Sequence, residues 1–165
     1  MGKEIEKRWA VKSIPEEVPE CSYLIEQSYS NLEPDVRVRK KTYADEVEFI
    51  HGVKYKISDI SKIEIESNIN EIDYERIIKY IGKRPIKKMR YVYNIGNGLE
   101  AELDVFVDVD KKVVEVEFST EDEANSFVKP KWFGEEIKSN YSVSKTIFKY
   151  VNKEATQEDI LNLFI

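Results

Sequence analysis

Pairs of like charges spaced two residues apart recur along this 165-residue chain and constrain its fold more than any other feature. The clearest pairs are Glu4-Ile-Glu6, Arg37-Val-Arg39, Lys54-Tyr-Lys56, Glu64-Ile-Glu66, Lys88-Met-Arg90, Glu102-Leu-Asp104 and Glu115-Val-Glu117, with Glu46-Val-Glu48 as a weaker eighth. On a β-strand this spacing puts both side chains on the same face, because successive residues point to opposite sides. The pattern therefore predicts many strands that carry charge on one face.

Period-two alternation and turn-forming residues together divide the chain into eight predicted strands. These strands lie near residues 3–13, 22–30, 35–43, 46–57, 60–67, 86–95, 99–109 and 112–118. Helical spacing and capping signals predict helices at Asp73 to Ile81, Thr120 to Phe127, Ser142 to Val151 and Thr156 to Phe164. The sequence therefore predicts an α+β fold with a mainly antiparallel sheet.

Composition limits the classes of protein that fit. The length suits a single domain over residues 1–165, with C-terminal helices from about residue 142. A net charge of −6 argues against a nucleic-acid binder. Cys21 is the only cysteine, which excludes an internal disulfide and favours a reducing compartment. No apolar signal core and no stretch of about 18 apolar residues is present, so we expect a cytoplasmic protein without membrane contact.

The charged faces have two interpretations. An antiparallel sheet with one solvated face explains any single pair. The whole set is harder to explain in this way, because most pairs are pure in sign and like charges opposed across strands destabilise a sheet. If the sheet closes into a barrel, the charged face becomes a lumen. Such a lumen could hold metal ions on its carboxylates and an anion on its Lys and Arg side chains.

The order of the motifs resembles that of the CYTH family, the triphosphate tunnel metalloenzymes. The similarity runs in order from residue 4 to about residue 144. It covers Glu4-Ile-Glu6-Lys-Arg8 (family E-x-E-x-K), Ile25-Glu-Gln-Ser-Tyr29 (I-x-Q-G-Y), Arg37-Val-Arg39 (R-x-R), Lys54, Glu64-Ile-Glu66 (E-x-E), Lys88-Met-Arg90 (K-x-R), Glu102-Leu-Asp104-Val-Phe106 (E-x-D-x-F), Val114-Glu-Val-Glu117-Phe (E-x-E-F) and Pro130 to Ile137 (P-x-W-x-G-x-E-V).

The resemblance implies an eight-stranded, mainly antiparallel closed β-barrel that forms a triphosphate tunnel flanked by helices. It implies triphosphate binding by Arg37, Arg39, Lys54, Lys88 and Arg90. It implies Mg²⁺ or Mn²⁺ ligands at Glu4, Glu6, Asp104, Glu115 and Glu117, since carboxylates suit these hard cations. Catalytic roles are expected for Glu6, Glu64 and Arg8. The sequence leaves open whether Glu64 and Glu66 bind metal, orient water or pair with the bases, and whether Lys56 reaches the lumen.

Departures from the family pattern occur at a few positions. Arg8 stands where the family usually has Lys, and an arginine cannot give up a proton as a buried lysine can. Gly52 stands where the basic fourth strand often has Thr, and Lys138 replaces the Thr of the usual E-V-T. The bases and acids that define the tunnel are all present, so we expect an active protein.

Three functions are compatible with these residues. The first is metal-dependent hydrolysis of tripolyphosphate or of a small organic triphosphate such as thiamine triphosphate. The second is a class IV type adenylyl cyclase that makes cyclic AMP from ATP in the same tunnel. The third is a non-catalytic binder of polyphosphate or nucleotides. Hydrolysis is favoured, because it needs only positioning, charge neutralisation and an oriented water. A homodimer is a further expectation that the sequence leaves open.

Overall fold

The structure is a computed structural model, and it describes residues 2–138 and 142–163. Its strands are β1 (Gly2–Val11), β2 (Cys21–Asn31), β3 (Asp35–Thr42), β4 (Val47–Lys56), β5 (Ser61–Asn68), β6 (Ile86–Gly96), β7 (Leu99–Phe106), β8 (Lys112–Phe118) and β9 (Phe133–Ile137). Its helices are α1 (Glu71–Ile81), α2 (Glu121–Ser126), α3 (Val143–Val151) and α4 (Gln157–Leu161).

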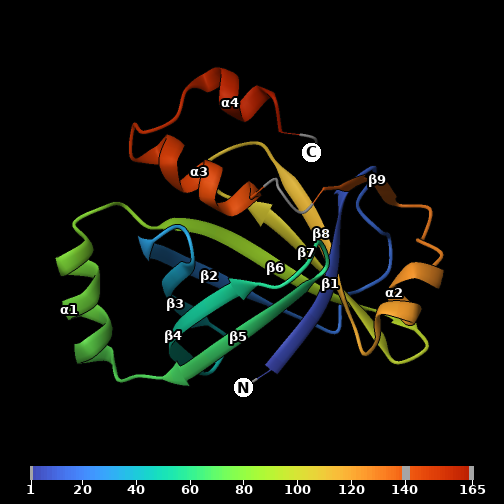
Figure 1. Ribbon diagram of the computed structural model, residues 1–165, viewed down its shortest axis with the longest axis horizontal. Helices are drawn as coiled ribbons and strands as arrows, with labels where there is room; N and C mark the ends of the chain where they lie inside the picture. The colour runs from blue at the N-terminus through green and yellow to red at the C-terminus, as the bar shows by residue number, and fades with distance from the viewer. Residues whose placement is uncertain (1, 139–141, 164–165) are drawn as a thin grey trace.

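The strands form an antiparallel sheet that closes on itself (Figure 1). The order is β5-β4-β3-β2-β6-β7-β8-β1-β9, and a further pairing between β1 and β5 closes the ring of eight strands. Closure pairs Gly2 with Glu64 and Ile5 with Ser61. The predicted eight-stranded antiparallel barrel is therefore confirmed, and β9 is an additional strand on β1.

Two element ends differ most from the sequence prediction. The seventh strand ends at Phe106, not at residue 109, because the Phe106 amide bonds to the Lys111 carbonyl in a turn. Asp108 then accepts hydrogen bonds from Arg84 and from the Lys87 amide. The last helix ends at Leu161, and the predicted end at Phe164 lies outside the described residues.

The short strand β9 was not predicted. Its sequence Phe-Gly-Glu-Glu-Ile places two acids side by side, which obscures the alternation that marks a strand. Its register pairs Arg8 with Ile137 and Val11 with Phe133. On this edge of β1, β9 is therefore the neighbour of the residues that follow those paired with β5.

Side chains at the predicted helix ends act as caps. Asn70 accepts from the Asp73 amide at the start of α1, and Gly82 ends this helix in the left-handed conformation, with φ of 67°. Thr120 accepts from the Glu123 amide at the start of α2, as predicted. These local signals place α1 and α2 outside the barrel wall (Figure 1).

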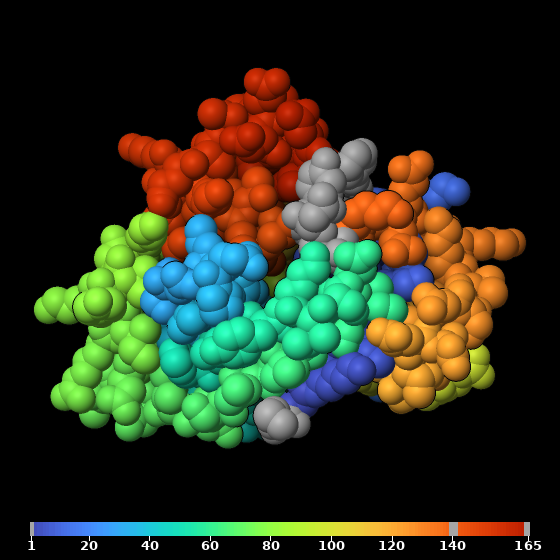
Figure 2. Space-filling view, in the orientation of Figure 1, coloured from blue at the N-terminus to red at the C-terminus, as the bar shows by residue number. Residues whose placement is uncertain are grey.

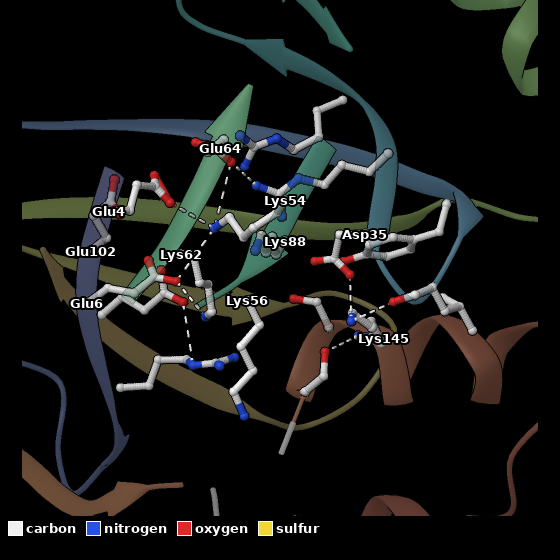
Figure 3. Close-up of a pocket in the computed structure, with 18 of the residues that line it drawn as sticks. Glu4, Glu6, Asp35, Lys54, Lys56, Lys62, Glu64, Lys88, Glu102 and Lys145 are labelled. Atoms are coloured by element: carbon white, nitrogen blue, oxygen red, sulfur yellow. Dashed lines mark hydrogen bonds and ion pairs between the residues drawn. The ribbon is translucent and has the colours of Figure 1, made fainter. Parts of the chain in front are cut away.

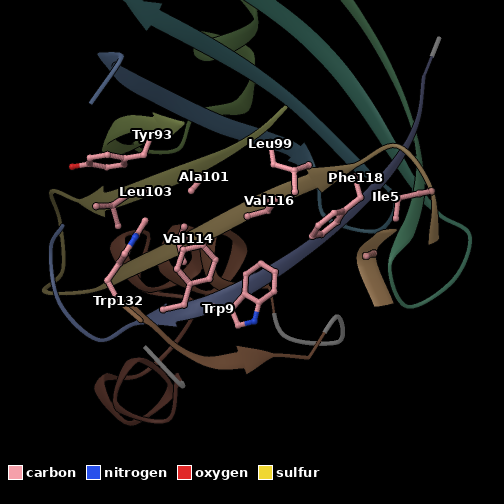
Figure 4. Close-up of a cluster of buried hydrophobic side chains, with 12 residues drawn as sticks. Ile5, Trp9, Tyr93, Leu99, Ala101, Leu103, Val114, Val116, Phe118 and Trp132 are labelled. Atoms are coloured by element: carbon pink, nitrogen blue, oxygen red, sulfur yellow. The ribbon is translucent and has the colours of Figure 1, made fainter. Parts of the chain in front are cut away.

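The apolar core lies outside the barrel wall. One cluster covers the outer face of β1, β7 and β8 and contains Trp9, Leu103, Val114, Trp132 and Phe133 (Figure 4). A second cluster lies beneath α3 and α4, where Ile147 and Phe148 pack on residues of the barrel end. Because the apolar face of these strands packs outside the barrel, their charged face lies toward the lumen. None of the helices formed by the described residues has both the length and the apolar character needed to cross a membrane.

A close backbone contact fixes β9 against β1. A Cβ atom at Gly134 would lie 3.1 Å from Ala10 Cβ and 3.2 Å from the Ala10 carbonyl oxygen. We therefore expect Gly134→Ala to lower the free energy of unfolding by about 1 kcal/mol or more, because the strand must shift to accept the methyl group. Urea unfolding measures this loss. Gly2→Ala, where nothing lies within 4 Å, is the matched control and leaves the midpoint unchanged.

Candidate active site

A cavity of about 630 Å³ occupies the barrel lumen. Charged side chains that alternate with the covered apolar residues line it, since the strand period sends every second residue inward. Every predicted site residue except Asp104 is among them: Glu4, Glu6, Arg8, Arg37, Arg39, Lys54, Glu64, Lys88, Arg90, Glu115 and Glu117. The structure thus brings the predicted set together in one cavity, while the role of each residue stays a prediction.

Two arginines of β3 reach across β4 to acids of β5. Arg37 donates to Glu64 at 3.0 Å, and Arg39 donates to Glu66 at 2.9 Å. The strand between them carries Gly52, paired with both Arg37 and Glu66. A Cβ at Gly52 would lie 3.3 Å from Glu66 Cγ, so glycine leaves the space through which these pairs form. The departure of Gly52 from the family pattern therefore has a structural consequence in this lumen.

Lys54 is the centre of the acidic cluster (Figure 3). Its ammonium lies 3.0 Å from Glu4, 3.5 Å from Glu6 and 3.7 Å from Glu64. Burial alone would lower the pKa of Lys54, but Glu6 and Glu4 raise it above its usual value, so the side chain stays charged. Burial likewise opposes ionisation of Glu6, whereas Lys54 and Lys62 hold the pKa of Glu6 well below its usual value.

Glu4 behaves differently from its neighbour Glu6. Burial raises the pKa of Glu4 to about 8, and the nearby Lys54 offsets this only in part. A hydrogen bond between the Glu4 and Glu64 side chains raises the pKa of Glu4 and lowers the pKa of Glu64. The pair therefore shares one proton near neutral pH, with Glu4 as the donor.

A buried triad of two bases and one acid lies on β6 and β7. Asp104 accepts from Arg90 Nε at 2.7 Å and from Arg90 Nη2 at 2.8 Å, and Lys88 lies 2.9 Å from Asp104. Burial would raise the pKa of Asp104, but Arg90 and Lys88 hold it well below its usual value. Burial lowers the pKa of Lys88 to about 8. In this arrangement both oxygens of Asp104 hold the two bases in place, and its predicted role as a metal ligand stays a prediction.

Acids of β1, β7 and β8 lie next to one another across neighbouring strands. Glu6 pairs in register with Glu117, and Glu102 with Glu115. Burial and then Glu6 raise the pKa of Glu117, and burial also raises that of Glu102. Such crowding of carboxylates is unfavourable without a cation, and oxygen donors suit Mg²⁺ or Mn²⁺. Within residues 2–138 and 142–163 no three acids are already arranged as a complete metal site.

The residues of the lumen include several that sequence reasoning missed. Lys41 and Lys62 line the cavity, as does Lys56, whose position had been left open. Period-two spacing from Arg39 and from Glu64 could have found the first two. Lys145 of α3 also lines the cavity, and it donates to the Leu32 carbonyl at 2.7 Å and pairs with Asp35. No periodic signal links a helix residue to the lumen, so the sequence offered no route to it.

The fold and its lining define a class of protein: a closed barrel whose lumen places basic side chains opposite carboxylates. No model of a protein family matches the chain. An inorganic triphosphatase of Acetivibrio thermocellus is 31% identical over 138 residues, which cover 83% of this chain and 86% of that protein. The chain therefore belongs to the CYTH family, the triphosphate tunnel metalloenzymes.

Solved structures agree with this assignment. The crystal structure of the inorganic triphosphatase NE1496 is 28% identical, with a TM-score of 0.58 and coverage of 93% of this chain and 94% of that one. A putative adenylyl cyclase from Hippeastrum, described as having a dominant triphosphatase activity, has a TM-score of 0.52 at 17% identity and covers 76% of this chain and 83% of its own. The second likeness supports the fold alone.

Proposed function

We propose that this protein hydrolyses inorganic tripolyphosphate to diphosphate and orthophosphate inside the barrel. The related triphosphatases support the reaction class. The observation that carries the proposal is the convergence of five bases on one lumen that also holds a carboxylate cluster: Arg37, Arg39, Lys54, Lys88 and Arg90. Triphosphate needs many positive charges at fixed positions, and guanidinium groups can bind phosphate oxygens in a bidentate manner.

The lining favours an inorganic substrate over ATP or thiamine triphosphate. Among the described residues of the cavity, only Tyr29 and Leu32 are aromatic or aliphatic. A base or a thiazole ring would need an apolar or stacking surface, which small-molecule sites usually provide. We therefore propose that the cavity takes a bare tripolyphosphate, with no organic group beyond its third phosphate.

Hydrolysis places simple demands on the chain. Water attacks the terminal phosphorus, its oxygen forms the new P–O bond, and diphosphate leaves as the old bridging bond breaks. Arg37, Arg39, Lys88 and Arg90 neutralise the phosphate oxygens. Glu4, Glu6, Glu115 and Glu117 would hold Mg²⁺ or Mn²⁺, which supplies charge neutralisation and a more acidic bound water. Glu64 accepts a hydrogen bond from the water, and Arg8 contributes charge but no proton.

The test is an incubation of the purified protein with Mg²⁺ or Mn²⁺ and, separately, tripolyphosphate, ATP and thiamine triphosphate. We expect orthophosphate and diphosphate from tripolyphosphate, and little turnover of the two organic substrates. Cyclic AMP from ATP would contradict the proposal in favour of a cyclase. Tight binding of tripolyphosphate without orthophosphate release would show a non-catalytic binder.

Metal binding should release a proton from the lumen. The pKa of Glu4 is raised to about 8, so at pH 7 this carboxyl carries a proton that a metal ligand must lose. We expect nearly one proton released per protein at pH 7 and little release at pH 9. The apparent affinity for Mg²⁺ therefore rises with pH and levels off above about 8. Calorimetry in two buffers of different ionisation enthalpy counts the protons.

The matched variant is Glu4→Gln, which has no proton to lose. It should abolish the buffer dependence at pH 7 even where some Mg²⁺ still binds. Equal proton release from the variant and the wild type would assign the titration to another group.

A further inference from the structure

The barrel wall has a gap along one edge of β1. Residues Gly2 to Ile5 pair on that edge with β5, whereas Arg8 to Val11 pair with β9. Between them the Glu6 amide donates to the Ile60 carbonyl at 2.9 Å, where β5 has not yet begun. At Glu6 and Lys7 the neighbour of β1 on this edge therefore changes from β5 to β9. Figure 2 shows N-terminal residues (blue) between the tip of the β4–β5 hairpin and the orange segment that contains α2 and β9.

A second cavity, of about 380 Å³, lies at this gap; we call it the seam pocket. Glu6 and Arg8 have the strand phase that points into the lumen, whereas Lys7 lies between them and points to the opposite face. All three residues line the seam pocket. A cavity lined by both faces of one strand must pass through the sheet at its edge. Because Glu6, Arg8 and Lys62 also line the lumen, the seam pocket lies directly beside the tunnel, with these side chains between the two cavities.

The seam pocket gathers cations that are poorly solvated and incompletely paired. The side chains of Lys7, Arg8 and Lys62 are only 16%, 15% and 13% exposed. Lys7 and Arg8 lie 3.8 Å from their carboxylate partners Glu136 and Glu115, beyond good hydrogen-bond distance. Their N–H groups therefore keep donor capacity for a small anion. Lys138 adds a fourth, exposed cation at the rim.

We propose that the seam pocket binds orthophosphate and is the lateral exit for this product of the proposed hydrolysis. The inference rests on the proposed function, because that reaction makes two anions of unequal size in one lumen. Diphosphate stays on the bases of β3 and β6, and the terminal phosphoryl group leaves through the wall beside Glu6 and Arg8. Lys62 is the side chain between the two cavities, and its Glu6 pair at 2.9 Å can exchange for a phosphate oxygen.

The size of the seam pocket agrees with this occupant. Its volume is far above the ~15 Å³ that one water needs, so a hydrated phosphate ion fits. Its lining carries more bases than acids: Lys7, Arg8, Lys62 and Lys138 against Glu6, Asp59 and Glu136. An anion therefore meets cations there with limited repulsion.

Product inhibition tests the proposal under conditions of constant free Mg²⁺. If orthophosphate binds in the seam pocket while tripolyphosphate fills the tunnel, added orthophosphate lowers kcat and does not act by raising KM alone. Lys138→Glu, at the rim, should raise the inhibition constant for orthophosphate about tenfold. Lys79→Glu, an exposed lysine on α1, is the matched charge control and leaves the inhibition constant unchanged. Purely competitive inhibition, or equal effects of both variants, overturns the proposal.

Direct binding separates this inference from the proposed function. Calorimetry on metal-free protein saturated with tripolyphosphate should still detect one orthophosphate site, which Lys7→Gln and Lys138→Glu weaken. Loss of that site on adding tripolyphosphate overturns the seam pocket as an exit, even when hydrolysis is normal. Absence of any hydrolysis with the site intact overturns the proposed function instead.

Discussion

We expect Glu117→Gln to lower the proposed metal-dependent hydrolysis of tripolyphosphate about 1,000-fold while the protein remains folded. The substitution removes one negative ligand from the cluster in which Glu117 faces Glu6. Charge stabilisation by a bound metal is worth several kcal/mol, and each 1.36 kcal/mol is a factor of ten in rate. Orthophosphate release at saturating Mg²⁺ measures the loss.

The fold should tolerate this change and even gain from it. Burial and neighbouring acids raise the pKa of Glu117, so a neutral amide removes repulsion. We therefore expect an unchanged or higher melting temperature without metal. Glu46→Gln, at an exposed position just before β4, is the control and should retain full activity. Full activity of Glu117→Gln would remove this residue from the metal site.

We expect Arg39→Ala to weaken the proposed tripolyphosphate binding about 100-fold with little effect on Mg²⁺ affinity. A charge-assisted hydrogen bond contributes about 1.5–3 kcal/mol, and Arg39 is a buried base on the lumen face of β3. Calorimetric titration of the wild type and the variant with each ligand gives the two affinities.

Stability distinguishes a binding role for Arg39 from a structural one. Arg39 Nε is buried with no hydrogen-bond partner in the described part of the chain. Burial lowers the pKa of Arg39, and Arg37 and Arg90 lower it further. This costs the fold free energy and offsets most of what the pair with Glu66 contributes, so Arg39→Ala should lower the melting temperature only slightly. A large drop, or equal losses of tripolyphosphate and Mg²⁺ binding, would indicate that Arg39 supports the barrel. Lys40→Ala, on the outward phase of the same strand, is the control.

Much of the barrel could be predicted because its signal is local. Arg37 and Arg39 point the same way on any strand, and Gly82 ends a helix whatever surrounds it. The ordered motifs then identified the charged faces as a lumen. The lining residues Lys41 and Lys62 also lie two residues from a charge of the lumen face, so their position could be predicted from spacing. They were missed because the family motifs do not include them.

Other features depend on contacts between distant segments. The pairing of Arg37 with Glu64 and of Lys54 with Glu4 follows from the register across three strands, which spacing within one strand does not determine. The strand β9 is stabilised by the close fit of Gly134 on Ala10, a contact between residues far apart in the sequence. The gap at Glu6 arises because two different partners share one edge of β1. None of these could be read from the sequence.

The nearly equal numbers of acids and bases around the lumen have a consequence for affinity. Most of the bases already have an acid as their counter-ion, as Lys54 and Arg90 show. A metal cation or a triphosphate anion that enters alone upsets electroneutrality and must separate these pairs. When the cation and the anion enter together, the acids pair with the metal and the bases pair with the triphosphate. The net charge of the lumen then changes less than with either ligand alone. Each ligand should therefore raise the affinity for the other by the same factor, as thermodynamic reciprocity requires.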